Sequence, residues 1–113
     1  IATVREDGAP NIGPKRSCRI YDDATLIWNE NTAGEIMKDI ERGSKVAVAF
    51  ANWDKLDGYR FVGTAEVHKE GKYYDEVVEW AKGKMGVPKA AVVFHIEEVY
   101  TLKSGPTAGT RID

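Results

Sequence analysis

The sequence predicts a mainly β fold, an antiparallel barrel of about six strands with two short helices. Apolar residues alternate with period two along most of the chain, whereas helical spacing occurs in only two stretches. Each helical stretch stands singly between strands, and a parallel doubly wound sheet would instead need helices that alternate regularly with strands. The 113 residues fit one domain, residues 1–113, and so small a domain gains stability by burying surface against a second copy.

Composition argues against several classes of partner. The chain has 16 basic and 18 acidic residues and a net charge of −2, so no overall field attracts nucleic acid or an anionic membrane. The lone Cys18 cannot form an internal disulfide, and the longest apolar run is roughly a third of the ~20 residues that a membrane span needs. We therefore expect a cytoplasmic protein with no nucleic-acid or membrane partner. Because Ile1 reads as the middle of a strand, we also expect an N-terminal segment before it.

Three strands are expected in the first 30 residues. Asp7-Gly8 suits a hairpin turn with positive φ and joins the first two strands. The second strand is expected to run over residues 11–20, although Pro14 cannot donate to a ladder. This strand also carries the cations Lys15, Arg16 and Arg19. The β-forming residues 25–29 predict the third strand.

A short helix is expected next, because its two ends carry recognisable signals. Thr32 and Glu35 have the spacing of a capping box, and Gly43 suits the position just past the last turn. A capping Glu35 would place its charge where the helix dipole favours an anion, an effect of roughly 0.3–1 kcal/mol that a bound phosphate would have to oppose. The apolar stripe of this helix is Ile36, Met37 and Ile40.

The second half of the chain predicts three more strands and one more helix. Residues 46–51 alternate a bulky face, which ends in Phe50, with a flat face of three alanines. Strands are also expected over residues 59–68 and 90–102, and a helix whose apolar face runs from Tyr74 to Met85 lies between them. Residues 104–113 show neither period and are expected to form a tail or arm.

One combination of features predicts a ligand site. Cationic side chains at residues 15–19, the polar turn at residues 29–34 and a helix N-terminus are groups that bind phosphate, and the alanine face would admit a flat ring system. The alternative is that the charges form a solvated face and that the alanines fill a tapering barrel. The sequence supports neither a metal site nor a thiol nucleophile, because His68 and His95 lie on separate strands and Cys18 has no nearby histidine in the sequence.

Three segments together resemble the FMN-binding split-barrel family of pyridoxamine 5′-phosphate oxidase-like proteins. They are ATVREDGAPNIGPKRSCRIYDDATLIW, IMKDIERGSKVAVAF and GYRFVGTAEV, and the similarity extends from Ala2 to about Tyr100. The resemblance implies a six-stranded antiparallel split barrel and a homodimer with FMN sites at its interface. It also implies flavin contacts from a first segment, Gly13, Pro14, Lys15, Arg16 and Ser17, and from a second segment, Asn29, Glu30, Asn31 and Thr32.

The sequence departs from the family pattern in the first turn of the helix. Family members that hold the FMN phosphate firmly carry a basic residue followed by Thr or Lys there, where this chain has Glu35 and Ile36. The phosphate would then be held from the strand or by Lys38, one turn further along. Trp53, in a hairpin loop, is a candidate for reaching the partner's site, whereas Trp28 and Trp80 are expected in the core.

The resemblance implies an FMN-dependent oxidoreductase that acts on a small-molecule substrate or an electron-transfer partner. No residue stands out as a general acid or base, so the catalytic residues are left unassigned. Two alternatives remain open: a non-catalytic module that binds a flavin nucleotide or another small ligand, and a barrel dimer that has lost its ligand. Glu35 and Ile36 favour the last of these.

Overall fold

The computed structural model describes residues 1–113 and contains seven strands and two helices. In chain order these elements are β1 (Ala2–Val4), β2 (Pro10–Ile12), β3 (Arg19–Asp22), β4 (Thr25–Glu30), α1 (Glu35–Glu41), β5 (Val46–Asn52), β6 (Asp57–His68), α2 (Lys72–Ala81) and β7 (Ala90–Thr101). The fold is the expected mainly β, antiparallel split barrel, with seven strands in place of six. Neither helix has the length and apolar composition to cross a membrane.

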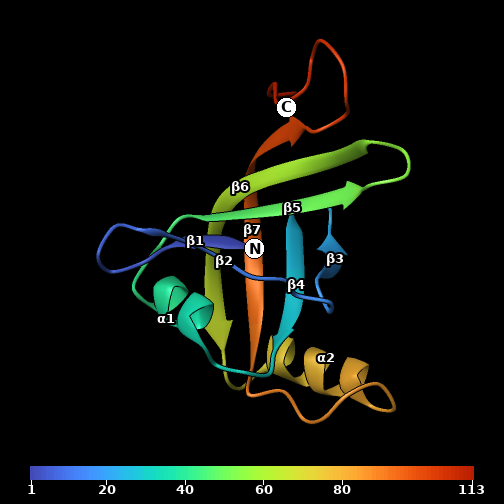
Figure 1. Cartoon of the computed structure of the whole chain (residues 1–113). Coiled ribbons are helices and arrows are strands. Elements are labelled where there is room, and N and C mark those ends of the chain that lie inside the picture. Colours follow the sequence, from blue (N-terminus) through green and yellow to red (C-terminus); the bar gives the residue numbers. More distant parts are fainter.

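All seven strands belong to one sheet, in the order β2-β1-β5-β6-β7-β4-β3, and every neighbouring pair is antiparallel. The sheet coils strongly, so that β5 and the paired first half of β6 cross the long strand β7 (Figure 1). Helix α1 lies beside the β1–β2 hairpin, and α2 lies under the ends of β4 and β7. The coiled sheet thereby brings β5 close to the segment between β2 and β3.

The main core lies inside this coil. Its buried members are Leu26, Trp28, Ile40, Val46, Val48, Val92 and Phe94, and all but Ile40 come from the sheet. Helix α2 covers the opposite face of β4 and β7, where Val77 packs with Ile27, Ala91 and Val93. Trp28 is fully buried, as expected, but Phe50 is 39% exposed because β5 runs beyond the core at this point.

A β-bulge interrupts the pairing of β6 with β7. Val62 pairs with Glu98 and Gly63 pairs with Ile96, so one extra residue of β7 is left between the two pairs. A Cβ atom on Gly63 would lie only 1.9 Å from the carbonyl oxygen of His95. Only glycine therefore permits this close approach of the two backbones.

Two sequence expectations about the first strands had different outcomes. The Asp7-Gly8 hairpin is confirmed, with Gly8 at φ 86°. The continuous strand expected over residues 11–20 is wrong, because β2 ends at Ile12 and β3 begins at Arg19. Pro14 lies in the irregular segment between them, which is free to border a ligand site instead of a neighbouring strand.

Helix α1 begins later than expected, and its predicted capping box is wrong. The N-cap is Gly34, and no side chain caps the helix. Glu35 instead forms an ion pair with Arg42 at 3.1 Å, on the solvent side of the helix. The expected C-terminal end is confirmed, since Gly43 has φ 91° and its amide donates to the carbonyl of Ile40.

The segment after β7 folds back along the end of that strand. The amide of Thr101 donates to the carbonyl of Thr110, and the amide of Gly109 donates to the carbonyl of Thr101. The amide of Ile112 donates to the carbonyl of Val99. This C-terminal arm follows β7 at the top of Figure 1, where β4 no longer pairs with β7.

Candidate functional site

A polar cleft of about 360 Å³ lies where the segment after β2, the end of β4 and the loop after α2 meet. Its lining residues are Pro14, Lys15, Arg16, Ser17, Asn29, Asn31, Thr32, Lys84 and Met85. Seven of these nine are residues that the family resemblance implied from the sequence. The cleft therefore brings together two segments that are separated by β3 and most of β4.

The lower wall of the cleft is held by a buried ion pair between Lys15 and Glu30. The Nζ of Lys15 lies 2.9 and 3.0 Å from the two carboxylate oxygens of Glu30. Only 13% of the Lys15 side chain and 1% of the Glu30 side chain are exposed. Burial opposes ionisation of Glu30, but the hydrogen bond and charge of Lys15, with Thr32 and Ala33, lower its pKa below the usual value. The positive charge of Lys15 is thus already compensated by a carboxylate of the protein itself.

The turn after β4 donates to the same carboxylate. The Thr32 hydroxyl lies 3.0 Å from Oε2 of Glu30, the Ala33 amide nitrogen 3.0 Å and the Thr32 amide nitrogen 3.3 Å. Ala33 has φ 51°, an uncommon conformation for a residue with a Cβ atom. We call this donor set, the Lys15 ammonium with the Thr32 hydroxyl and the two amides, the Glu30 cradle. An internal carboxylate does occupy the anion position near the helix, but it belongs to Glu30 and not to Glu35.

Two cations near the cleft lie against the ring of Trp80. The guanidinium of Arg19 lies 4.0 Å from the centre of a Trp80 ring, and the Nζ of Lys84 lies 4.9 Å from it. Arg19 also donates to the carbonyl of Ser17 at 2.7 Å and to Asn29 at 3.1 Å, so it supports the wall of the cleft without lining it. Trp80 is therefore half-buried beneath charged groups, and its expected place in the core is wrong.

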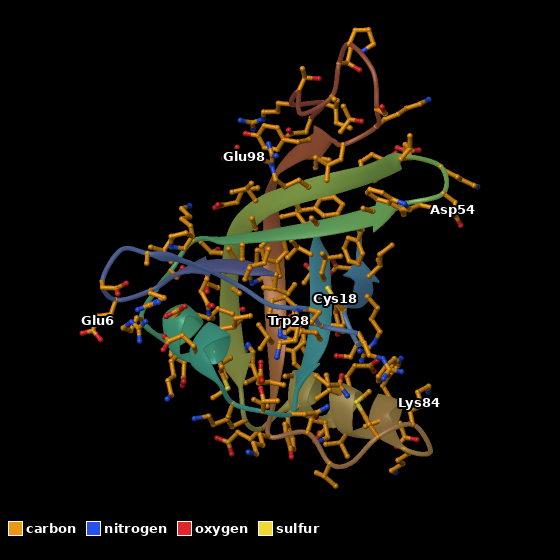
Figure 2. All side chains as sticks on the ribbon, viewed as in Figure 1. Glu6, Cys18, Trp28, Asp54, Lys84 and Glu98 are labelled. Carbon is orange, nitrogen blue, oxygen red and sulfur yellow. The ribbon has the colours of Figure 1, made fainter.

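The loop after α2 closes the cleft through Met85. Helix α2 ends at Ala81, and Gly83, at φ 77°, turns the chain back toward β4. The sulfur of Met85 accepts from the side-chain amide of Asn31 at 3.3 Å. Met85 is thus a cleft residue and not part of the helical stripe that the sequence predicted. Lys84 projects from the same loop at the lower right of Figure 2.

An apolar hollow of about 280 Å³ lies on the other side of the segment after β2. It is lined by Ile1, Pro14, Lys15, Arg16, Cys18, Val48, Ala49 and Phe50. Residues 14–16 border both the polar cleft and this hollow. The hollow includes one alanine of the flat face that the sequence predicted on β5. Burial raises the pKa of the Cys18 thiol to about 11, so this thiol is not activated as a nucleophile.

Four of the expected site residues do not line the cleft. Gly13 packs against Ile36, whose side chain would lie 3.0 Å from a Cβ atom at that position. Lys38 is exposed on α1, and Trp53 is 85% exposed in the turn between β5 and β6. Glu30 lies beneath the cleft in its cradle. His95, which the sequence excluded as a metal ligand, lies on β7 with its Nε2 2.8 Å from a carboxylate oxygen of Glu66.

The cleft also contains two residues that the sequence did not identify as site residues, Lys84 and Met85. Lysine and methionine are both common in helices, and Gly83, followed closely by Gly86 and Pro88, signals that the helix ends before them. The sequence also did not predict that Glu30 is the ion-pair partner of Lys15. Nothing in the spacing of Lys15 and Glu30, 15 positions apart, predicts that they meet.

Comparisons with known proteins identify the family and the fold of the chain. Residues 1–103 match the family model described as pyridoxamine 5′-phosphate oxidase. The crystal structure of HupZ from Group A Streptococcus is 53% identical, with a TM-score of 0.88 over 96% of this chain and 86% of that one. An uncharacterized protein of Methanocaldococcus jannaschii is 39% identical over 99% of this chain and 77% of its own length.

A more distant structure has the same fold. An FMN-binding protein from Syntrophomonas wolfei is 20% identical and has a TM-score of 0.72, over 89% of this chain and 74% of that one.

Proposed function

The chain belongs to the pyridoxamine 5′-phosphate oxidase family, and on this premise we propose that it binds the flavin nucleotide FMN across residues 14–16. The observation that carries the proposal is the pair of hollows that share these residues, one polar and one largely apolar. A phosphorylated ligand with a flat ring needs this combination, because its two ends require opposite surroundings. The ring would lie toward Ala49 and the phosphate toward Arg16 and Lys84.

The residues of the site fit an anionic ligand, but only through particular cations. Arg16 and Lys84 line the polar cleft and are exposed, and neither is paired with a carboxylate. The Nζ of Lys84 donates to the carbonyl of Trp80 at 3.1 Å, which leaves its charge uncompensated and available to a phosphate. Lys15 is paired with Glu30, and Glu35 is paired with Arg42. The grip on the phosphate therefore comes from Arg16 and from the loop after α2, and not from the first turn of α1.

Bound FMN would supply one- and two-electron redox chemistry, and the protein would supply binding, orientation and charge. Arg16 is the exposed cation that borders both hollows, so its charge would favour the reduced, anionic form of a flavin. We propose an oxidoreductase that passes electrons to a small-molecule substrate or a redox partner. The single, free Cys18 is consistent with a reducing, cytoplasmic setting.

A second candidate is a module that binds a flavin nucleotide or another small ligand without turnover. The occupied Glu30 cradle and the Glu35–Arg42 pair favour it, since both remove groups that would hold a phosphate firmly. Steady-state reduction by a nicotinamide nucleotide separates the two candidates. Turnover with FMN bound supports the oxidoreductase, and binding without turnover supports the module.

We expect the purified protein, or apo-protein reconstituted with FMN, to show flavin absorbance. Replacing both Arg16 and Lys84 with alanine should weaken FMN binding by roughly three- to tenfold, because exposed charge pairs contribute little each, and should leave riboflavin binding unchanged. Fluorescence titration measures both affinities. Lys103→Ala is the matched control, since this exposed lysine lines neither hollow. Colourless protein that also fails reconstitution would refute the proposal.

We also propose a homodimer whose interface includes the β5–β6 hairpin. Four large apolar side chains of this hairpin are exposed: Phe50 by 39%, Trp53 by 85%, Leu56 by 52% and Tyr59 by 46%. Such a cluster on a small domain is typical of an interface. Phe50 also lines the apolar hollow, so a partner that covers the hairpin would help to enclose the flavin ring, and Trp53 would reach toward the partner's site.

Trp53→Asp is expected to shift the protein from dimer to monomer, because an exposed aromatic anchor at an interface commonly contributes about 2 kcal/mol or more to association. Light scattering after size exclusion gives the mass in solution. Val87→Asp is the control, since Val87 is 77% exposed in the loop after α2, far along the chain from the hairpin. An unchanged mass for Trp53→Asp, or equal dissociation of both variants, would exclude the hairpin as the interface.

A further inference from the structure

The Glu30 cradle has the donors of an oxyanion site but holds a carboxylate of the protein itself. Five hydrogen bonds converge on Glu30, two from the Lys15 ammonium and three from the Thr32 hydroxyl and the amides of Thr32 and Ala33. Adjacent amides with a hydroxyl and an ammonium are the groups that bind phosphate in many proteins. Glu30 is fully buried, so its carboxylate is shielded from solvent and depends on these donors.

The Glu30 cradle lies next to the polar cleft, so it affects which ligands the cleft can bind. Lys15 and Thr32 both line the polar cleft and both donate to Glu30, so the cradle adjoins the space that a ligand would enter. An anionic group placed there would meet a charged carboxylate, whose pKa Lys15 and the turn hold below the usual value despite its burial. A second anion would therefore be repelled from the best donors in the site.

We propose that Glu30 is the specificity-determining residue of the polar cleft, because its carboxylate takes the place of a ligand phosphate and leaves the anionic group of the ligand to Arg16 and Lys84. The native chain therefore discriminates only weakly between phosphorylated and unphosphorylated forms of the same ring. The identity of that ring rests on the proposed function, whereas the exclusion of phosphate by Glu30 does not.

The first test uses inorganic phosphate as the probe and two variants that both remove the negative charge beside Lys15. Glu30→Ala opens the cradle, whereas Glu30→Gln fills the same space without charge. We expect the melting temperature of Glu30→Ala to rise by about 5 °C or more when phosphate replaces chloride at equal ionic strength. Wild type and Glu30→Gln should shift only by the smaller amount that phosphate gives any protein.

Adding Lys15→Met to Glu30→Ala should abolish the specific rise, because the cation that binds phosphate is then absent. An equal rise in Glu30→Ala and Glu30→Gln would overturn the proposal, and so would a Glu30→Ala protein that neither gains stability nor refolds in phosphate. Because no flavin is used, this result is independent of whether the protein binds FMN.

The second test asks whether the cradle controls ligand choice. The ratio of riboflavin to FMN dissociation constants should be below about tenfold in wild type and should increase by about tenfold or more in Glu30→Ala, because the flavin phosphate then reaches Lys15 and the turn amides. An unchanged ratio with both ligands bound would overturn the proposed role of Glu30. Failure of wild type and variant to bind either flavin would refute the proposed function, while the phosphate result would still decide the exclusion.

Discussion

Lys15→Met is expected to lower the free energy of unfolding by about 3–5 kcal/mol at neutral pH, because it leaves the Glu30 carboxylate buried without its cation. The side chains of Lys15 and Glu30 are 13% and 1% exposed, so water cannot replace the lost partner. Urea unfolding followed by circular dichroism measures the change. Lys45→Met is the matched control, since Lys45 pairs with Glu97 at a similar 3.0 Å on the surface and its loss should cost about 1 kcal/mol or less.

The same variant has a pH dependence of known sign. The pKa of Glu30 is lowered in the wild type, so the contribution of the pair is complete above about pH 4.3 and is lost as the pH falls through the lower folded-state value. Without Lys15, burial raises the pKa of Glu30, and the carboxyl group is protonated at about pH 4. The deficit of Lys15→Met should therefore shrink on acidification. A deficit that is equal at pH 7 and at about pH 4 would contradict the assignment of this cost to a buried charge.

Gly63→Ala is expected to destabilise the fold by about 4 kcal/mol or more, a large part of the stability of a domain of this size. The added Cβ would overlap the carbonyl oxygen of His95 at 1.9 Å and approach the amide of Glu97 at 3.3 Å. Both atoms belong to the backbone of β7, so no side-chain rotation relieves the overlap, and β6 and β7 must separate at their bulge. Thermal and urea unfolding give the magnitude.

Gly86→Ala is the control for the general effect of replacing glycine. A Cβ atom at Gly86 would meet nothing within 4 Å, so the change should fall within about 0.5 kcal/mol of zero or stabilise slightly through the unfolded chain. A Gly63→Ala protein as stable as Gly86→Ala would show that the bulge can rearrange without loss. The tight approach of the two longest strands would then not limit the sequence at this position.

Local patterns predicted those parts of the fold that depend on local chemistry. The Asp7-Gly8 turn, the strand that contains Trp28 and the end of α1 at Gly43 are each determined by a few adjacent residues, and all three are confirmed. The start of α1 was predicted wrongly for a non-local reason. The Thr32 hydroxyl that would have capped the helix donates to Glu30, which is charged and buried because Lys15 approaches from a segment 15 positions earlier.

In the candidate site, too, local segments were predicted and non-local contacts were not. The segment before β3 and the turn after β4 were identified from the sequence, and the structure brings them together in one cleft. Lys84 and Met85 were missed because the apolar spacing of α2 continues past its last residue, Ala81, whereas the chain turns at Gly83 and Met85 contacts Asn31. Trp80 was predicted in the core because tryptophan is usually buried, but here the side chains of Arg19 and Lys84 pack over its ring.

The C-terminal arm has a consequence for how the molecule behaves among many copies of itself. Past His95, β7 no longer pairs with β4, and this edge of β7 would expose unpaired amides and carbonyls that could bind a strand of another chain. Thr101 and Val99 instead exchange their hydrogen bonds with Thr110, Gly109 and Ile112 of the same chain. Residues 104–113 thus protect the edge of β7 from pairing with strands of other copies, and changes to this segment would expose that edge.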